Sequence, residues 1–326
     1  MSSVEYHRLA RTGAHRWWRL VAGSAFIVVA GAVLALVLAL IFTVAAVIAG
    51  RSGVAGSPPT LGPLADLAMT FLVIGLLLPV TQLAAWWIQR RPPGTLSSVT
   101  GRLRWRRLGT CLLLATGAVG LSLGGALALG AATGADTGLG DRLAAPASIA
   151  AALAVLLLVV PVQAAAEEYL MRGWLLQGVG AWFRRPWAPI LVQALVFAAL
   201  HGWGTPWGFA DLTAFGLVAG WLTVRTGGLE AAVALHVMNN LFGAGLAAAY
   251  GDLGMDETAA DMPWQMAVAD VTVLIAYAVV VHLIFRSRSE PPLPACYRPR
   301  PNQTGDRRIA LKDNATTANF ERPHHA

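Results

Sequence analysis

Three charged side chains stand together inside a long apolar run of this sequence. They are Glu167, Glu168 and Arg172 in the stretch AAAEEYLMR, and residues 146–183 contain no other charged residue. An ionised side chain in a bilayer costs roughly 2.5–3.5 kcal/mol even on insertion scales, so such groups are rare outside functional sites. This cluster is therefore the first candidate for chemistry.

Imidazole and amide side chains occur in two later apolar runs. His201 ends the stretch FAALH, and His236 lies in HVMNN, four residues before Asn240. Residues four apart share one face of an α-helix, so His236 and Asn240 point the same way, as do Phe197 and His201. Each of these apolar segments can thus present its polar side chains to one neighbouring helix.

Helix geometry separates the two adjacent glutamates. Glu168 and Arg172 are i,i+4 neighbours, and by pairing they can offset the cost of removing both charges from water. Glu167 lies about 100° around the helix from Glu168, so its carboxylate can serve a different partner.

A carboxylate and two imidazoles around one cavity are the groups that peptide hydrolysis needs. The carboxylate can take a proton from water and make it a nucleophile. A second imidazole and an amide can donate to the developing oxyanion. Residue types alone leave other interpretations open: Glu168 and Arg172 can form a structural ion pair, and the histidines can join helices by hydrogen bonds.

Read in order, EEYLMR, FAALH and HVMNN have the forms EExxxR, FxxxH and HxxxN. Together they resemble the signature of the CAAX-protease and bacteriocin-processing family (CPBP, or ABI) of intramembrane endopeptidases. The resemblance spans residues 167–240 and implies Glu167 as general base and His201 as its water-holding partner.

The same resemblance implies an oxyanion side formed by His236 and Asn240. It implies supporting roles for Glu168, Arg172 and Phe197. All of these motif positions are occupied by the expected residue types, so the pattern predicts an intact site.

The cofactor stays open between no metal and zinc. Glu167, His201 and His236 could ligate zinc as an open three-ligand site, or a metal-free water could lie between them. The HExxH spacing of many zinc proteases is absent. We favour a site without a cofactor and keep zinc as the alternative.

The composition requires a membrane scaffold for these groups. Only 13% of the 326 residues are charged, against about 25% in soluble domains. Eight apolar segments approach the roughly 20 residues needed to cross a bilayer. Their approximate bounds are 20–49, 64–88, 108–133, 146–178, 187–201, 209–224, 229–250 and 264–285. The predicted fold is all-α, a polytopic membrane protein with an eight-transmembrane-helix bundle.

Arginine placement predicts that both termini are cytoplasmic, because positive residues favour cytoplasmic loops. Arginines gather before the first segment and in every second loop, whereas the intervening loops carry few positive charges. We expect a cytoplasmic N-terminal segment (1–19), a transmembrane bundle (20–288) with a catalytic core at about 146–250, and a disordered cytoplasmic tail (289–326).

Depth poses a difficulty for this site. At ~1.5 Å per residue, a straight fourth segment places Glu167 roughly 25 Å from the cytoplasmic face and His236 only about 10–15 Å deep. The two side chains meet only if that segment bends, tilts or breaks, and Gly173 or the glycines of 178–180 are the candidate positions.

The predicted function is that of an intramembrane peptidase, which hydrolyses a peptide bond of a membrane-associated substrate. The apolar segments indicate a multi-pass membrane protein, and the alanine- and arginine-rich, nearly lysine-free composition indicates a high-GC bacterium and hence a bacterial plasma membrane. The family resemblance implies prenylated CAAX tails as substrates of eukaryotic relatives, so in a bacterium we expect a membrane-bound peptide, pheromone or bacteriocin precursor instead. Expected partners are membrane lipids and a peptide or protein substrate, and not nucleic acid. The alternatives are a transporter of ions or small solutes that uses the same polar cluster, and a non-catalytic scaffold or immunity factor.

Overall fold

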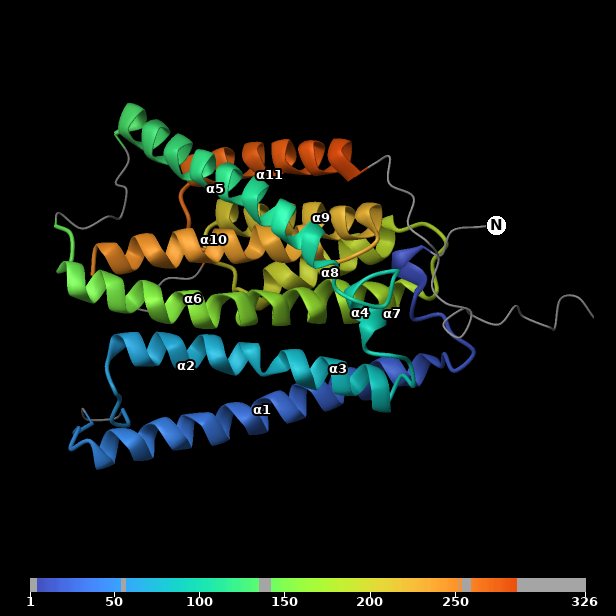
Figure 1. The fold of residues 1–326 in the computed structure, drawn as a ribbon, viewed down its shortest axis with the longest axis horizontal. Helices are drawn as coiled ribbons and strands as arrows, with labels where there is room; N and C mark the ends of the chain where they lie inside the picture. Colours follow the sequence, from blue (N-terminus) through green and yellow to red (C-terminus); the bar gives the residue numbers. More distant parts are fainter. Residues whose placement is uncertain (1–4, 54–56, 135–141, 252, 254–258, 286–326) are drawn as a thin grey trace, which may run out of the picture.

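The computed structural model describes residues 5–53, 57–134, 142–251, 253 and 259–285, and this part of the chain is built of helices (Figure 1). Seven helical spans within it are long and apolar enough to cross a membrane. These spans are Trp17–Ile48, Pro63–Trp87, Trp105–Thr133, Pro146–Gly180, Pro206–Thr226, Glu230–Ala249 and Trp264–Phe285. The prediction of an all-α polytopic membrane protein is confirmed.

The eighth predicted segment is a shorter apolar helix, α8 (Trp187–Leu200), of 14 residues. At 1.5 Å per residue it is about 21 Å long, which is less than the roughly 30 Å of a bilayer core. The count of eight crossings, the side of the termini and the division into domains therefore stay predictions. The predicted tail at 289–326 lies outside the described residues.

Ten further helices and two short irregular elements complete the described architecture. In chain order they are η1 (Tyr6–Arg8), α1 (Trp17–Ile48), α2 (Pro63–Gly75), α3 (Leu77–Trp87), α4 (Gly94–Ser97), α5 (Trp105–Thr133), α6 (Pro146–Glu168), η2 (Tyr169–Leu175), α7 (Leu176–Gly180), α9 (Pro206–Thr226), α10 (Glu230–Ala249) and α11 (Trp264–Phe285).

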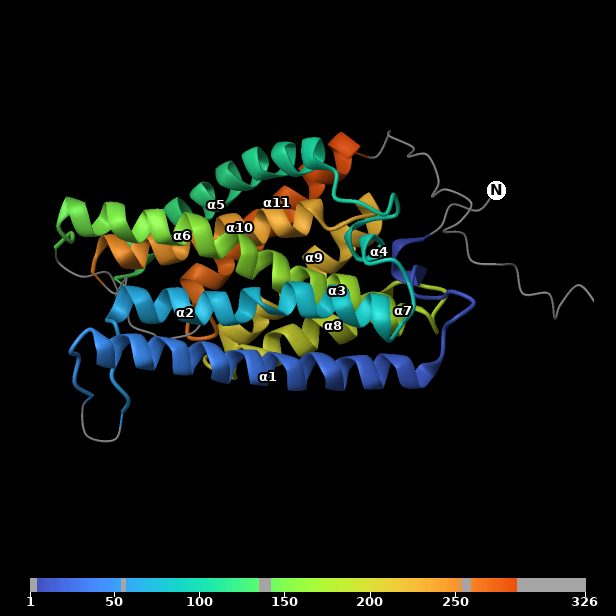
Figure 2. The same ribbon diagram turned by 60° about the horizontal axis from the view of Figure 1, so that its bottom comes forward.

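The helices form a bundle in which α6 and α10 lie side by side near the centre (Figure 1, Figure 2). On one side, α2 packs against α6, and α1 covers α2 and α3 from outside. On the other side, α5 and α11 pack together, and α5 also contacts α10. The pair α8 and α9 completes the bundle beside α11 and η2. The three predicted motif segments are thus neighbours.

The fourth segment is not one continuous α-helix. Pro161 lies inside α6, where it lacks the N–H that would continue the helical hydrogen bonds. The segment then passes into a π-helical stretch, η2, which contains Gly173. Such π turns occur mostly inside α-helices and often at functional sites. Of the positions where a bend or break was expected, Gly173 thus lies in this π-helical stretch, whereas Gly178 and Gly180 lie within α7.

Close contact between α8 and α9 depends on a glycine. A Cβ atom at Gly216 would lie 2.7 Å from the Cα atom of Ala194, so any larger residue would push the helices apart. The side-chain amide of Gln193 donates to the Gly216 carbonyl across the same contact (2.7 Å). Small residues of this kind allow membrane helices to approach closely. The contact holds α8, and with it His201 at its end, against the bundle.

An ion pair fixes the start of α10. The Glu230 carboxylate in its first turn accepts hydrogen bonds from the backbone N–H of Arg104 (2.8 Å) and from its guanidinium group (2.6 and 2.9 Å). The two side chains are 9% and 2% exposed, so solvent screens the pair little. This pair ties the start of α5 to the helix that carries His236.

Candidate active site

One carboxylate and two imidazoles meet at the centre of the candidate site. The Oε2 atom of Glu167 lies 3.7 Å from Nε2 of His236 and 4.0 Å from Nε2 of His201. Glu167 lies in the last turn of α6, His201 follows α8, and His236 lies in the second turn of α10. The three catalytic side chains predicted around one solvent position are therefore brought together from three separate segments.

Hydrogen bonds on the far side of each ring define which nitrogen carries the proton. Nδ1 of His201 lies 2.8 Å from the backbone oxygen of Phe197, and a carbonyl oxygen can only accept, so Nδ1 donates. Nδ1 of His236 likewise donates to Oε1 of Glu168 at 2.8 Å. In a neutral ring the other nitrogen is then an acceptor. Both Nε2 atoms therefore direct lone pairs toward the region around Glu167.

Glu168 forms the predicted pair with Arg172. Its Oε1 atom accepts from a guanidinium nitrogen at 2.8 Å, and both side chains are 0% exposed. Two further guanidinium nitrogens, Nε and Nη2, have no hydrogen-bond partner in the part of the chain that the structure describes. The guanidinium group instead lies over the rings of Phe197 (4.6 Å) and Phe215 (5.5 Å), where a cation is attracted by the aromatic face.

Phe197 contacts both imidazoles as well as this cation. Its ring centroid lies 4.5 Å from that of His201 and 5.9 Å from that of His236. The phenyl ring is 3% exposed, and the backbone oxygen of the same residue orients His201. Phe197, predicted as a supporting residue, therefore lies between the Glu168–Arg172 ion pair and the two imidazole rings.

A residue that the sequence motifs did not indicate, Gln163, also contacts the candidate base. Its amide nitrogen donates to Oε1 of Glu167 at 2.5 Å, and its amide oxygen accepts from Nδ2 of Asn240 at 2.9 Å. Gln163 is 3% exposed. The signal in the sequence was its position four residues before Glu167 on the same helix, which places the two side chains on one face.

Asn240 therefore uses one of its two amide hydrogens to hold Gln163. The second amide hydrogen stays available to another acceptor. Asn240 also lines the large cavity beside Glu167. This position is compatible with its predicted role on the oxyanion side of the site.

A cavity of about 820 Å³ opens beside Glu167 and His201. Its polar lining comes mainly from α6 and α10, whereas α2 adds an apolar wall with Leu67, Phe71 and Ile74. The remaining lining residues are Thr70, Leu77, Gln163, Leu170, Met171, Phe197, Leu200, Asn239, Asn240, Gly243, Ala244, Ala247, Leu253 and Ala259. An apolar cavity with a few convergent polar groups is typical of a binding site.

Zinc would need three donors at about 2.0–2.2 Å from a single point. In the described part of the chain, no three His, Cys, Asp or Glu side chains are arranged to hold a metal ion. The donor types around Glu167 suit zinc, but their placement does not form such a group. The hydrolysis reaction proposed below therefore involves no metal ion.

A comparison with protein families matches residues 149–242 to the family described as "Rce1-like: Type II CAAX prenyl endopeptidase Rce1-like". This segment is therefore similar to that family. The match begins in α6 and ends in α10, so it includes every residue of the three motifs and Gln163. The resemblance to the CAAX-protease family of membrane proteases is thereby confirmed over these residues.

Among curated proteins, the chain is similar to the "Uncharacterized protein YyaK" of Bacillus subtilis (strain 168), with 28% identity over 186 residues. The alignment covers 55% of this chain and 60% of that protein. The chain thus spans about 60% of the relative's length. No solved structure matches the chain. The bacterial relative and the apolar spans of this chain agree with a multi-pass protein of a bacterial membrane.

Proposed function

We propose that the protein is an intramembrane endopeptidase in which Glu167 activates a water molecule held beside His201 and His236. The observation that carries this proposal is the convergence of one carboxylate and two imidazole Nε2 atoms at 3.7 and 4.0 Å. These separations are too long for direct hydrogen bonds and leave a place for a shared water. The Rce1-like match over the same residues supports the reaction class.

In the proposed reaction, Glu167 takes one proton from water while the water oxygen forms a bond to the carbonyl carbon of the peptide. Nε2 of His201 accepts the hydrogen bond of the other water proton. The carbonyl π electrons move to its oxygen and form an oxyanion. When the C–N bond then breaks, the leaving amine takes the proton from Glu167, and the carboxylate is restored.

His236 lies on the oxyanion side of the proposed site and stabilises this oxygen when its Nε2 atom carries a proton, because only an N–H can donate to it. The second amide hydrogen of Asn240 can bind the same oxygen.

The proposed substrate is a membrane-associated peptide, which reaches the apolar wall of the cavity from the bilayer. The test uses purified protein in proteoliposomes with a library of membrane-anchored fluorogenic peptides. Release of the fluorophore, with fragments identified by mass spectrometry, would support the peptidase. Ion or solute flux in the same vesicles without any cleavage would contradict it and support the transporter.

Gln163 is proposed as a positioning residue for the base, because its amide holds the carboxylate atom that faces away from the imidazoles. Gln163→Leu is expected to lower kcat/KM by roughly 10- to 100-fold, since small misplacement of a catalytic group has effects of this size. Peptide cleavage in proteoliposomes measures this. If the residue acts through Glu167, adding Gln163→Leu to Glu167→Gln causes no further loss. Unchanged kcat/KM in the single variant would exclude the role.

Metal removal tests the proposal of a metal-free site. After dialysis against a strong chelator, the enzyme is expected to keep its cleavage rate within about twofold, because Glu167 acts by proton transfer alone. The measurement pairs the rate with the zinc content of the same sample by elemental mass spectrometry. Loss of activity that stoichiometric zinc restores would contradict the proposal and support ligation by Glu167, His201 and His236.

A further inference from the structure

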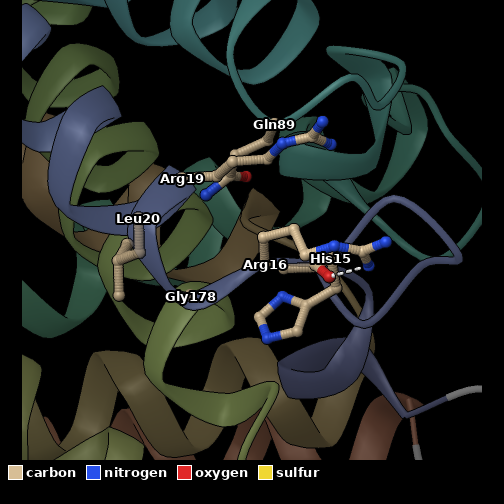
Figure 3. A pocket seen from close by; sticks show the side chains of 7 residues that line it. His15, Arg16, Arg19, Leu20, Gln89 and Gly178 are labelled. Atoms are coloured by element: carbon tan, nitrogen blue, oxygen red, sulfur yellow. Dashed lines mark hydrogen bonds between the residues drawn. The ribbon is translucent and has the colours of Figure 1, made fainter.

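A basic recess lies at the start of α1, at the opposite end of that helix from the loop that follows Ile48 (Figure 1). We call it the α1 recess. Figure 3 shows His15, Arg16 and Arg19 around it, with Gln89 and Gly178 contributed by other segments. Ala10 and Leu20 complete its lining. Its interior holds about 10 Å³, room for one water-sized group, so a phosphate would place a single oxygen inside it.

Unused hydrogen-bonding atoms face this region. Nε of Arg19 and Nε2 of His15 are buried and have no hydrogen-bond partner among the described residues. In that part of the chain, the guanidinium groups of Arg16 and Arg19 donate to the backbone oxygens of His15 (2.7 Å) and Ala14 (2.5 Å). Neither forms an ion pair with a carboxylate in the described part of the chain. Within the described residues, no carboxylate therefore pairs with this positive charge.

The neighbouring arginines and a helix end make this region positive. Burial, and then the guanidinium groups of Arg11, Arg16 and Arg19, lower the pKa of His15, so the imidazole offers a neutral hydrogen-bonding group and not a further charge. In addition, α1 begins here with Arg16 at its N-cap, without a side-chain cap and without an acidic residue in its first turn. The N-terminal end of a helix carries partial positive charge and attracts anions.

Exposed tryptophans place this end of the bundle at the membrane interface. Trp17 and Trp18 are 67% and 47% exposed, and Trp86 and Trp87 at the end of α3 are 64% and 63% exposed. Tryptophan is enriched at the headgroup level of bilayers. The guanidinium group of Arg19 lies 5.3 Å from the ring of Trp18, so the unbalanced charge is at the same depth.

We propose that the α1 recess binds the phosphate group of an anionic phospholipid, with Arg16, Arg19 and His15 as its donors. The phosphate supplies the negative charge and acceptor oxygens that these groups lack, and the acyl chains extend along the exposed apolar face of α1. A soluble phosphate ion offers the same oxygens, but the interfacial tryptophans favour the lipid. This inference is independent of the proposed peptidase activity.

The test measures binding of phosphatidylglycerol and of phosphatidylcholine to the purified full-length protein by native mass spectrometry in detergent. Wild type is expected to bind phosphatidylglycerol more tightly. The double variant Arg16→Gln/Arg19→Gln is expected to bind it roughly 10- to 30-fold more weakly, since each arginine near an anionic surface contributes about a factor of five.

The matched control is Arg51→Gln/Arg142→Gln, which removes the same charge from exposed arginines at the opposite end of the bundle. It is expected to bind phosphatidylglycerol as wild type does. An equal loss in both double variants would overturn the proposal, because it would indicate a general charge effect. Displacement of the lipid by equimolar inorganic phosphate would overturn the assignment to a lipid. Helical circular dichroism of each variant confirms that it is folded.

Discussion

Glu167→Gln is expected to lower kcat/KM for peptide cleavage by roughly 100- to 10,000-fold, the range that general acid–base catalysis supplies. The amide has the shape of the carboxylate but cannot take a proton from water. Cleavage of the best peptide from the library, followed in proteoliposomes, measures the loss. No other single change at the site is expected to reduce the rate as far.

This variant is also expected to fold, which makes the result interpretable. The new amide oxygen can still accept from Gln163. The NH₂ group can face the acceptor nitrogens of His201 and His236, which lie 4.0 and 3.7 Å, respectively, from the carboxylate in the wild-type site. The unfolding temperature in detergent should therefore be close to that of wild type. A variant that cleaves at the wild-type rate would show that Glu167 is not the base.

Arg172→Met is expected to destabilise the protein by about 3–5 kcal/mol, because it leaves the Glu168 carboxylate buried without its cationic partner. Both side chains are 0% exposed, so water cannot replace the missing charge. The contact of the guanidinium group with Phe197 is lost in the same step. The free energy of unfolding in mixed micelles, measured by denaturant titration, gives the magnitude.

The matched control removes both charges. Glu168→Gln/Arg172→Met keeps an amide oxygen that can accept from His236 and leaves no uncompensated charge, so it is expected to lose less stability than Arg172→Met alone. Replacing both partners of a buried pair is often far less costly than removing one. Equal losses in the two variants would mean that the pair contributes through packing and not through charge.

Local spacing allowed several parts of the site to be predicted from the sequence. The pair Glu168–Arg172 and the contact between Phe197 and His201 each join residues four apart, and the pitch of an α-helix sets such contacts whatever surrounds them. The all-α membrane fold was predictable for a related reason, because a bilayer forces long apolar segments to satisfy their backbone hydrogen bonds within helices.

Spacing along the chain did not determine which segments meet. Glu167 approaches His236 where α6 passes into the π-helical stretch η2, and Gly173 in that stretch was only one of the positions where a break was expected. Gln163 joins Asn240 to Glu167 across two helices, and no motif indicated it.

The amino-acid sequence by itself determined the residue types of the site, the helices that carry them and the contacts within each helix, since all of these follow from periodicity and solvation over one short segment. Only the tertiary structure decided that Glu167, His201 and His236 lie around one position. His201 is 34 residues from Glu167 and 35 residues from His236 in the sequence. Their meeting depends on how whole helices pack against one another, and this is a balance of many contacts that no local sequence pattern contains.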